Sequence, residues 1–258
     1  MDVPNVISRQ EQILDYLKGR NLATVDDIVS AIGASPATIR RDLIKLDQQG
    51  AISRTHGGVT LNRFVPAQPT TPEKQFRNLA EKRAIAALAC EMVKPNYSVV
   101  LDAGTTTLET ARMLVGLPLR VFTSDLNIAL LFASCPQIEV TLTGGVVDHN
   151  SQSCVGEHGG EFLRSIYPDI AFVSANCWSL DRGITTPTAE KASLKACLVA
   201  NARQRVLVAD SSKYGSYALY RALPLSALTT VITDTNLPAE IRHYLEQQAF
   251  ELKLATGK

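Results

Sequence analysis

Two adjacent arginines in the stretch SPATIRRDL, residues 35–43, have the chemistry that binds phosphates and base edges. A guanidinium group can donate two parallel hydrogen bonds to a phosphate or to guanine, and the hydroxyl of Thr38 can also hydrogen-bond. Ser35 is placed to cap a helix that has Pro36 at its first position, and the N–H groups of a helix N-terminus also bind phosphate. The stretch is therefore either a nucleic-acid surface or a solvated helix face, and the elements around it decide between the two.

Three short helices and a β-hairpin are predicted around this stretch. A Ser-x-x-Glu capping box opens a helix over residues 8–19, a second helix spans residues 24–33, and a third spans residues 35–50. Gly57-Gly58 then separates two strand-like runs within residues 51–61, which predicts a hairpin. This order of elements is that of a winged helix-turn-helix, in which the later helix of the pair recognises DNA.

The third helix separates an apolar face from a polar one. Ile39, Leu43 and Leu46 recur at helical spacing and are expected to pack inward, which leaves a different face for Arg41. The residues expected to contact DNA are Ser35, Thr38, Arg40, Arg41, Lys45, Arg54 and His56. Which of them reach bases stays open, and one of the adjacent arginines could instead pair with Asp42 or with Asp47.

A second candidate site follows the apolar run SVVLD, residues 98–102. The next residues, 103–107, read Ala-Gly-Thr-Thr-Thr and precede a predicted helix, and a helix N-terminus lined with hydroxyls can cradle a phosphate. The loop lacks the Gly-Lys-Ser/Thr of a P-loop and the full Gly-x-Gly-x-x-Gly of a dinucleotide fold. By itself it fits an ordinary strand-to-helix turn as well as it fits a binding site.

Strands and helices alternate through the rest of the chain, and the strands are nearly continuous runs of Val, Ile and Leu. This pattern predicts a largely parallel sheet covered on both faces. Ligands bind such sheets outside the carboxyl ends of the strands, so hydroxyls, glycines and a lysine that follow the strands suit a small, anionic, hydroxyl-rich ligand. These residues are Gly104, Thr105, Thr106, Thr107, Thr123, Ser124, Gly144, Gly145 and Lys213, with Lys195 as either a site residue or a surface lysine.

Both candidate sites resemble the signature of the DeoR family of bacterial repressors. ATIRRDLIKLDQQGAISRTHGGV is similar to the family's recognition-helix pattern Thr-x-Arg-Arg-Asp-Leu, then Leu-x-x-x-Gly and Arg-x-x-Gly-Gly. LDAGTTT is similar to its Asp-x-Gly-Thr-Thr loop, and DSSKYG to its Asp-x-Ser-Lys-Phe/Tyr-Gly. The resemblance adds Asp102 and Glu190 to the expected effector-binding residues, with Glu190 and Lys195 as a Glu-x-x-x-x-Lys pair. The chain departs from the family at Thr123-Ser124, where Thr-Asn is usual.

The resemblance implies an α/β protein with two domains. A winged helix-turn-helix DNA-binding domain is expected over residues 1–62 and an effector-binding domain over residues 78–258, with a mostly parallel sheet related to the ribose-5-phosphate isomerase fold. Residues 63–77 hold three prolines, which predicts an extended linker. The resemblance also implies a repressor of a carbohydrate-utilisation operon that binds operator DNA, responds to a phosphorylated sugar or sugar-derived metabolite, and forms a homo-oligomer, a dimer or higher.

Composition sets limits on other functions. The formal net charge is +1, so the positive charge that DNA binding needs must be local. No apolar run approaches a membrane span and no signal pattern opens the chain, so a cytoplasmic protein is expected. Five scattered cysteines form no Cys-x-x-Cys pair and no ligand spacing with the four histidines, so no metal and no cofactor is expected.

Two alternatives use the same parts. An activator or dual regulator would have this architecture too. A sugar-phosphate isomerase fused to a DNA-binding domain needs a positioned carboxylate base. No acid follows the predicted strand DIAFVSA, residues 169–175, before Asp181, so we expect that the chain is not an enzyme.

Overall fold

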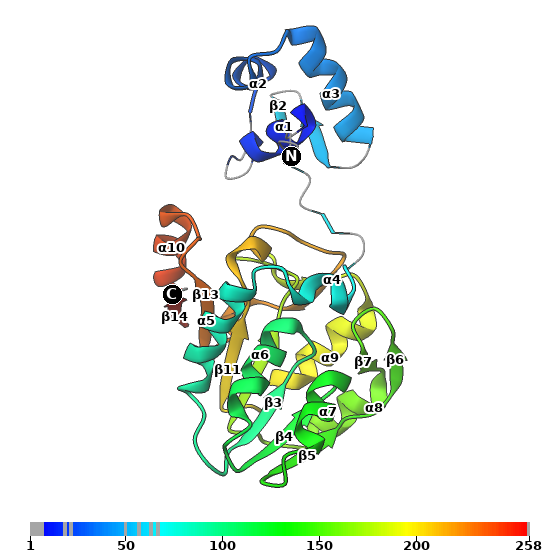
Figure 1. Ribbon diagram of the computed structural model, residues 1–258, viewed down its shortest axis with the longest axis vertical. Coiled ribbons are helices and arrows are strands. Elements are labelled where there is room, and N and C mark those ends of the chain that lie inside the picture. The colour runs from blue at the N-terminus through cyan, green and yellow to red at the C-terminus, as the bar shows by residue number, and fades with distance from the viewer. Residues whose placement is uncertain are drawn as a thin grey trace, which may run out of the picture. The chain divides into compact units, whose positions relative to one another are not determined.

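The structure is a computed structural model that describes residues 8–17, 20, 23–48, 51–55, 58–61, 64–65 and 68–256. It divides into two compact units, Met1–Arg63 and Phe64–Lys258, each with its own hydrophobic core (Figure 1). In the part of the chain that is described, no helix is long and apolar enough to cross a membrane.

The N-terminal unit contains the predicted helices and hairpin. The helices are α1 (Arg9–Leu17), α2 (Val25–Ile32) and α3 (Pro36–Gln48), and β1 (Ile52–Thr55) pairs antiparallel with β2 (Gly58–Leu61). A capping box between Thr24 and Asp27 opens α2, and Gly33 ends it with a left-handed φ of 74°. The burial of Ile39 and Leu43 on α3 follows the spacing in the sequence. The predicted winged helix-turn-helix is therefore present.

The C-terminal unit is built on a seven-stranded sheet in which every neighbouring pair is parallel. In spatial order the strands are β14 (Glu251–Ala255), β13 (Thr230–Asp234), β11 (Gln204–Val208), β8 (Ile170–Ser174), β3 (Ser98–Leu101), β4 (Leu119–Thr123) and β5 (Ile138–Leu142). The chain proceeds outward from β3 in one direction and from β8 in the other. The order thus reverses between β3 and β8, where open parallel sheets form their ligand crevices.

Helices cover both faces of this sheet, which confirms the predicted α/β fold class. One core lies under α5 (Leu79–Cys90), α6 (Thr105–Leu114) and α7 (Leu126–Ala133), and the other lies under α8 (Glu157–Arg164), α9 (Ala189–Val199) and α10 (Ala239–Glu246). Val99 and Leu101 of β3 face the first core while Val100 faces the second. Because both faces are buried, the central strands β3 and β8 are almost entirely apolar instead of alternating.

Smaller elements complete the edges. A hairpin of β6 (Val146–Asp148) and β7 (Ser153–Val155) follows β5, and a second sheet has the order β12 (Tyr220–Leu223), β10 (Gly183–Thr186), β9 (Cys177–Ser179). Two 3₁₀ turns are η1 (Ser211–Lys213) and η2 (Leu225–Ala227). β5 ends at Leu142, and the chain turns after it because Gly144 and Gly145 take φ values of 74° and 119°, outside the β region.

The linker predicted over residues 63–77 is wrong for residues 71–75, which form the short helix α4 (Thr71–Gln75). A capping box between Thr70 and Glu73 starts this helix, and Pro72 is tolerated because it lies in the first turn. Thr71 and Lys74 are buried against the C-terminal unit. Residues from Phe64 onward therefore belong to the C-terminal unit, as far as they are described.

Candidate functional site

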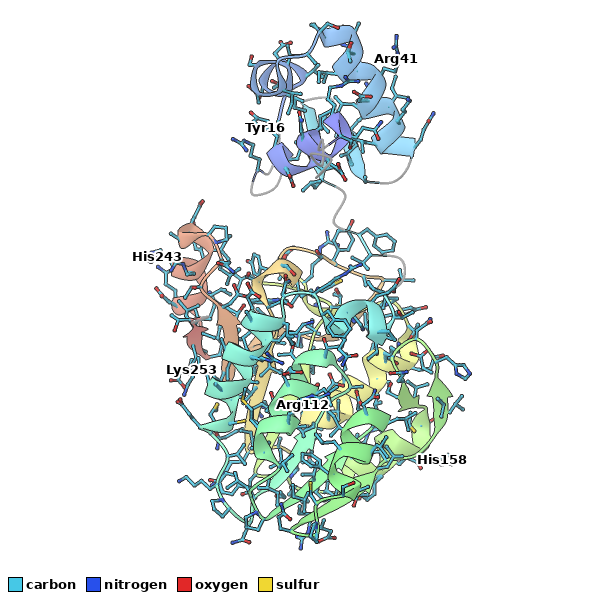
Figure 2. The ribbon with its side chains drawn as sticks, viewed as in Figure 1. Tyr16, Arg41, Arg112, His158, His243 and Lys253 are labelled. Carbon is cyan, nitrogen blue, oxygen red and sulfur yellow. The ribbon has the colours of Figure 1, made fainter. Side chains whose placement is uncertain are left out.

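The recognition helix α3 presents its cations to solvent. Arg40, Arg41 and Lys45 are exposed on α3, Arg54 is exposed on β1, and none of them pairs with an acid among the described residues. Figure 2 shows Arg41 extending away from its helix. His56 lies outside the described residues. The face opposite the buried leucines therefore carries an unneutralised positive charge.

The start of α3 is organised by Ser35. Its hydroxyl accepts from the backbone N–H of Thr38 at 3.3 Å, and the two hydroxyls lie 2.8 Å apart. Both residues were expected to contact DNA, and here they also cap the helix. Exposed hydroxyls at a helix N-terminus are suited to phosphate oxygens.

Asp42 does not pair with either adjacent arginine, because the Arg9 guanidinium of α1 takes that place. The Arg9 Nε–Asp42 Oδ2 distance is 2.5 Å, and Asp42 is only 5% exposed. The hydrogen bond from Arg9 holds the pKa of Asp42 below its ordinary value. This pair fixes α3 to α1 and leaves both Arg40 and Arg41 available to a ligand.

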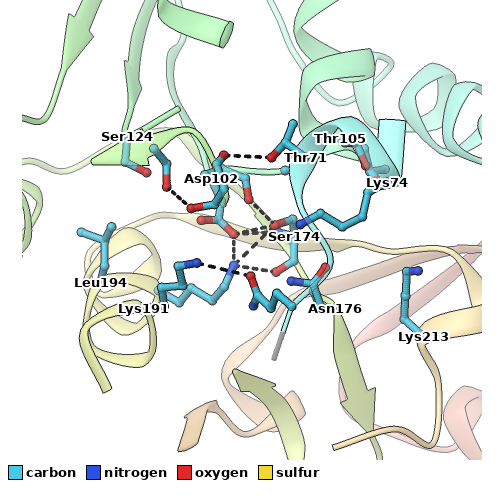
Figure 3. A pocket seen from close by; sticks show the side chains of 18 of the residues that line it. Thr71, Lys74, Asp102, Thr105, Ser124, Ser174, Asn176, Lys191, Leu194 and Lys213 are labelled. Atoms are coloured by element: carbon cyan, nitrogen blue, oxygen red, sulfur yellow. Dashed lines mark hydrogen bonds and ion pairs between the residues drawn. The ribbon is translucent and has the colours of Figure 1, made fainter. Parts of the chain in front are cut away.

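The second site is a pocket in the C-terminal unit at the switch between β3 and β8 (Figure 3). Loops that follow β3, β4, β8 and β11 contribute to it, together with α4, α5, α9 and the β6–β7 hairpin. Its described lining is Gln68, Thr71, Lys74, Lys82, Asp102, Ala103, Gly104, Thr105, Thr106, Ser124, Ser151, Ser153, Val155, Ser174, Ala175, Asn176, Lys191, Leu194, Lys195, Asp210 and Lys213. Polar side chains dominate this lining, so the pocket fits a polar ligand.

The lining carries five lysines against two aspartates. Lys74 and Lys213 have no carboxylate within ion-pair distance among the described residues. Burial, together with the charges of Lys191, Lys195 and Lys213, lowers the pKa of Lys74 to about 8. Such mutual repulsion is relieved when an anion binds between the lysines.

One aspartate of the lining is already neutralised at the pocket floor. Asp102 accepts hydrogen bonds from the backbone N–H and the hydroxyl of Ser174, both at 2.9 Å, and forms an ion pair with Lys195. Lys195 also donates to the carbonyl of Ser174 at 2.9 Å. Asp102 and Lys195 are 3% and 8% exposed, so this pair is a buried structural unit.

The first turn of α6 faces the pocket with unused hydrogen-bonding groups. Within the described part of the chain, the backbone N–H groups and hydroxyls of Thr105 and Thr106 have no hydrogen-bond partner. The hydroxyl of Ser124, fully buried in the lining, also lacks one. Buried polar groups are normally paired, so these groups point to a polar ligand.

Gly104 permits this arrangement because the chain passes close to β8 there. A Cβ on Gly104 would lie 2.6 Å from the Ser174 hydroxyl oxygen. The Gly104 N–H is not free, because the carboxylate of Asp125 accepts it at 3.2 Å while capping α7. Burial raises the pKa of Asp125 to about 6, against three backbone hydrogen bonds that lower it.

Five expected effector-binding residues lie outside this lining. Thr107 donates to the carbonyl of Gly104, and Thr123 donates to the carbonyl of Leu101, so both hydroxyls serve the backbone. Glu190 is exposed on α9, one residue from the position that faces the pocket. Gly144 and Gly145 only turn the chain after β5. The lining includes the other expected residues, Asp102, Gly104, Thr105, Thr106, Ser124, Lys195 and Lys213.

Sequence reasoning missed three lysines of the lining, Lys74, Lys82 and Lys191, which lie on helices. Lys191 forms an ion pair with Asp148 of β6 at 2.5 Å. Burial would raise the pKa of Asp148, but the Lys191 ammonium and the Ser151 hydroxyl outweigh it and lower that pKa to about 2. Lys74 and Lys82 reach the pocket from α4 and α5. The Thr-x-x-Glu pattern of residues 70–73 is the one sequence signal that could have revealed α4.

Comparisons with known proteins cover nearly the whole chain. A DeoR-like helix-turn-helix domain model matches residues 9–64, and a DeoR C terminal sensor domain model matches residues 77–235. The chain is 38% identical to the uncharacterized HTH-type transcriptional regulator YgbI of Escherichia coli K12, over 98% of this chain and 99% of that one. It is 30% identical to the putative aga operon transcriptional repressor of Escherichia coli O157:H7, over 98% and 95%.

Likeness to solved structures is distant. Ribose 5-phosphate isomerase A from Neisseria gonorrhoeae is similar with a TM-score of 0.38 and 18% identity, over 52% of this chain and 53% of that one.

Proposed function

The chain belongs to the DeoR family of helix-turn-helix transcriptional regulators, and on that premise we propose a repressor whose operator binding is modulated by a phosphorylated sugar or sugar-derived metabolite. α3 and the β1–β2 hairpin bind the operator, and the pocket between β3 and β8 binds the effector. The repressor role follows the name of the relative from Escherichia coli O157:H7. The cytoplasmic location and a homo-oligomeric state belong to the same proposal.

The observation that carries the effector assignment is the set of unused donors in the pocket. Lys74 and Lys213 lack acidic partners, and the first turn of α6 offers free N–H groups and hydroxyls. A phosphate monoester carries close to two negative charges at neutral pH and accepts several hydrogen bonds, so it matches both features. The hydroxyls of Ser124, Ser151 and Ser153 in the same lining suit the hydroxyl groups of a sugar.

The DNA assignment is supported by the separation of charge on the N-terminal unit. The exposed arginines of α3 face away from the core, while the acids Asp26 and Asp27 lie in the first turn of α2, where they stabilise that helix. Arginine donors at the start of a recognition helix bind phosphates and guanine edges.

Catalysis by an isomerase-like mechanism has little support from the geometry. Proton transfer needs a positioned base with an atom free to accept the proton. Asp102 is held through Oδ2 by Lys195 and Ser174, and Asp210 accepts through Oδ1 from Asn78 at 2.9 Å and from the Ser212 hydroxyl. Each carboxylate thus holds neighbouring residues through one oxygen, and the relatives that the chain matches are transcriptional regulators, which favours binding without turnover.

The test uses the full chain and operator duplexes that it selects from random sequence. Sugars, polyols and aldonic acids are added, each with and without a phosphate group, and operator affinity is measured at one salt concentration. A phosphorylated compound should change the affinity while its unphosphorylated form does not. Lys213→Met should raise the concentration of the phosphorylated compound that gives half of the change in operator affinity, by at least about tenfold. Lys94 is exposed and outside the pocket, so Lys94→Met should leave that concentration unchanged. A response to unphosphorylated compounds alone would remove the phosphate from the proposal.

A further inference from the structure

Residues 64–78, here called the connector, follow directly in sequence from the N-terminal unit. The connector joins the C-terminal unit at Val65, whose backbone N–H donates to the carbonyl of Tyr217 at 2.8 Å. The ring of Phe64 packs on that of Tyr217 with centroids 5.5 Å apart. Among its described residues, Gln68, Thr71 and Lys74 line the pocket.

Two polar residues then tie the connector to the pocket rim. Gln68 donates to the hydroxyl of Thr186 at 3.2 Å and accepts from the ammonium of Lys191 at 3.4 Å. Thr71 donates its backbone N–H to Asn150 at 2.8 Å and its hydroxyl to the carbonyl of Ser151 at 3.0 Å. Both Gln68 and Thr71 line the pocket, so the connector is a wall of the site and not a tether beside it.

The buried charge on the connector is Lys74 of α4. Its side chain points into the pocket, as Figure 3 shows, and the residue is 8% exposed. Its ammonium forms no hydrogen bond or ion pair with another described residue. Its carbonyl, by contrast, accepts from the ammonium of Lys82 at 2.6 Å. α4 is thus docked through its backbone while its own charge is left without a counter-charge.

We propose that Lys74 binds the anionic group of the effector, so that the effector holds the connector on the C-terminal unit and thereby transmits pocket occupancy to the DNA-binding unit. A ligand shifts a conformational equilibrium only by its differential affinity for the two states. Lys74 supplies that difference, because it reaches the effector only while α4 is docked. The inference rests on the proposed function and specifies how that function is regulated.

Electrostatics gives the direction of the effect. In the empty pocket, Lys74 lies among Lys191, Lys195, Lys213 and Lys82, whose charges oppose its protonation. This repulsion weakens the docking of α4. An anion between the lysines turns the repulsion into attraction, so effector binding should tighten the connector instead of releasing it.

Hydrogen exchange of the full chain, with inorganic phosphate as the probe, tests the coupling. The control measurement replaces phosphate with chloride at the same ionic strength. Amides of the first turn of α6 report anion binding, and the Thr71 and Lys74 amides, bonded to Asn150 and Thr70, report docking of the connector. At about nine times its Kd, phosphate should slow the exchange of both regions by about tenfold.

Three variants separate the contributions. Lys74→Arg keeps the charge and should retain both effects. Lys213→Met removes a pocket charge outside the connector, so phosphate binds more weakly but still protects the connector when it saturates α6. Lys74→Met should leave α6 protected at saturation and lose the protection of the connector.

Three results would overturn the inference. Protection of α6 without the connector in the unmodified chain would reject the coupling and leave the anion pocket standing. Equal protection of the connector in Lys74→Met would remove Lys74 from the role. Protection of neither region would reject the anion pocket itself, and the coupling with it.

Discussion

The two candidate sites both depend on positive charge, yet they present it in opposite ways. The cations of α3 lie within a few residues of one another and are exposed. The lysines of the pocket come from α4, α5, α9 and η1, and most are buried. Exposed charges interact with a polyanion through a salt-screened field, whereas buried charges are screened little and repel one another until an anion arrives. The same chemistry thus suits an extended polyanion in one region and a small anion in the other.

The largest effect should come from breaking the buried ion pair of the pocket floor. Lys195→Met leaves the Asp102 carboxylate buried with only Ser174 as donor, so the free energy of unfolding should fall by about 3–5 kcal/mol. Urea denaturation followed by Trp178 fluorescence measures it, since this single tryptophan is buried in the C-terminal unit.

The exposed Lys45 of α3 is the matched control for that prediction. Lys45→Met should change the stability by less than about 0.5 kcal/mol, because its charge lies in water. The double variant Lys195→Met with Asp102→Asn should recover part of the loss, since no unpaired charge remains. Equal losses at Lys195 and Lys45 would erase the contrast between the sites.

Loss of Arg41 tests the exposed region directly. Arg41→Ala should weaken operator binding by about 1–3 kcal/mol at fixed salt, and should flatten the salt dependence if the contact is to phosphate. Fluorescence anisotropy of a labelled operator duplex measures both. Arg203→Ala, an exposed arginine of the C-terminal unit, should leave affinity unchanged. Operator affinity that is insensitive to Arg41 removes it from the interface.

A methyl group at Gly104 should damage the pocket in proportion to the close approach of Ser174. Gly104→Ala places a Cβ 2.6 Å from the Ser174 oxygen, so the α6 loop must shift and stability should fall by about 1–3 kcal/mol, with weaker phosphate binding. Gly116→Ala is the control, because a Cβ there meets nothing within 4 Å. Thermal shift with and without phosphate compares them. Similar behaviour of the two variants would contradict the close contact.

The smallest expected effect is the uptake of a proton by Lys74 when the pocket binds an anion. The pKa of Lys74 falls from 10.5 to about 8 on folding, through burial and neighbouring lysines, so the folded chain holds fewer protons than the unfolded chain between these values and its stability should rise with pH there. A bound anion raises that pKa again. Sulfate binding just above pH 8 should therefore take up protons.

Calorimetry in two buffers of different ionisation enthalpy detects this uptake as a difference in heat. Sulfate is suitable because its own charge is constant in this range. The difference should vanish in Lys74→Met and persist in Lys94→Met. Identical heats in both buffers for the unmodified chain would show that Lys74 is not coupled to the anion.

The sequence predicted the N-terminal unit well because its signals are local. Caps, glycine stops and apolar spacing lie within one or two helical turns, so the solvent-facing side of α3 follows from the period of Ile39, Leu43 and Leu46. The Arg9–Asp42 pair was not predicted, since it joins residues in different helices whose packing angle the sequence does not state.

In the C-terminal unit, the rule that ligands bind beyond the carboxyl ends of parallel strands led to five of the lining residues, and the family resemblance pointed to two more, Asp102 and Lys195. The rule also selected Thr107 and Thr123, whose hydroxyls turn to the backbone, because the direction of a side chain in a turn depends on the turn geometry. Lys74, Lys82 and Lys191 could not be found in this way, because they lie on helices and reach the pocket only through packing.

The sequence by itself thus determined the class of both domains, the exposed cations of α3 and the strand-end loops, because each is encoded in neighbouring residues. Only the tertiary structure decided that Gln68, Thr71 and Lys74 of the connector line the pocket and that Lys74 enters it without a counter-charge. The charge of a lysine is written in the chain, but its burial, and with it the strength of its interactions, depends on which distant segments fold around it.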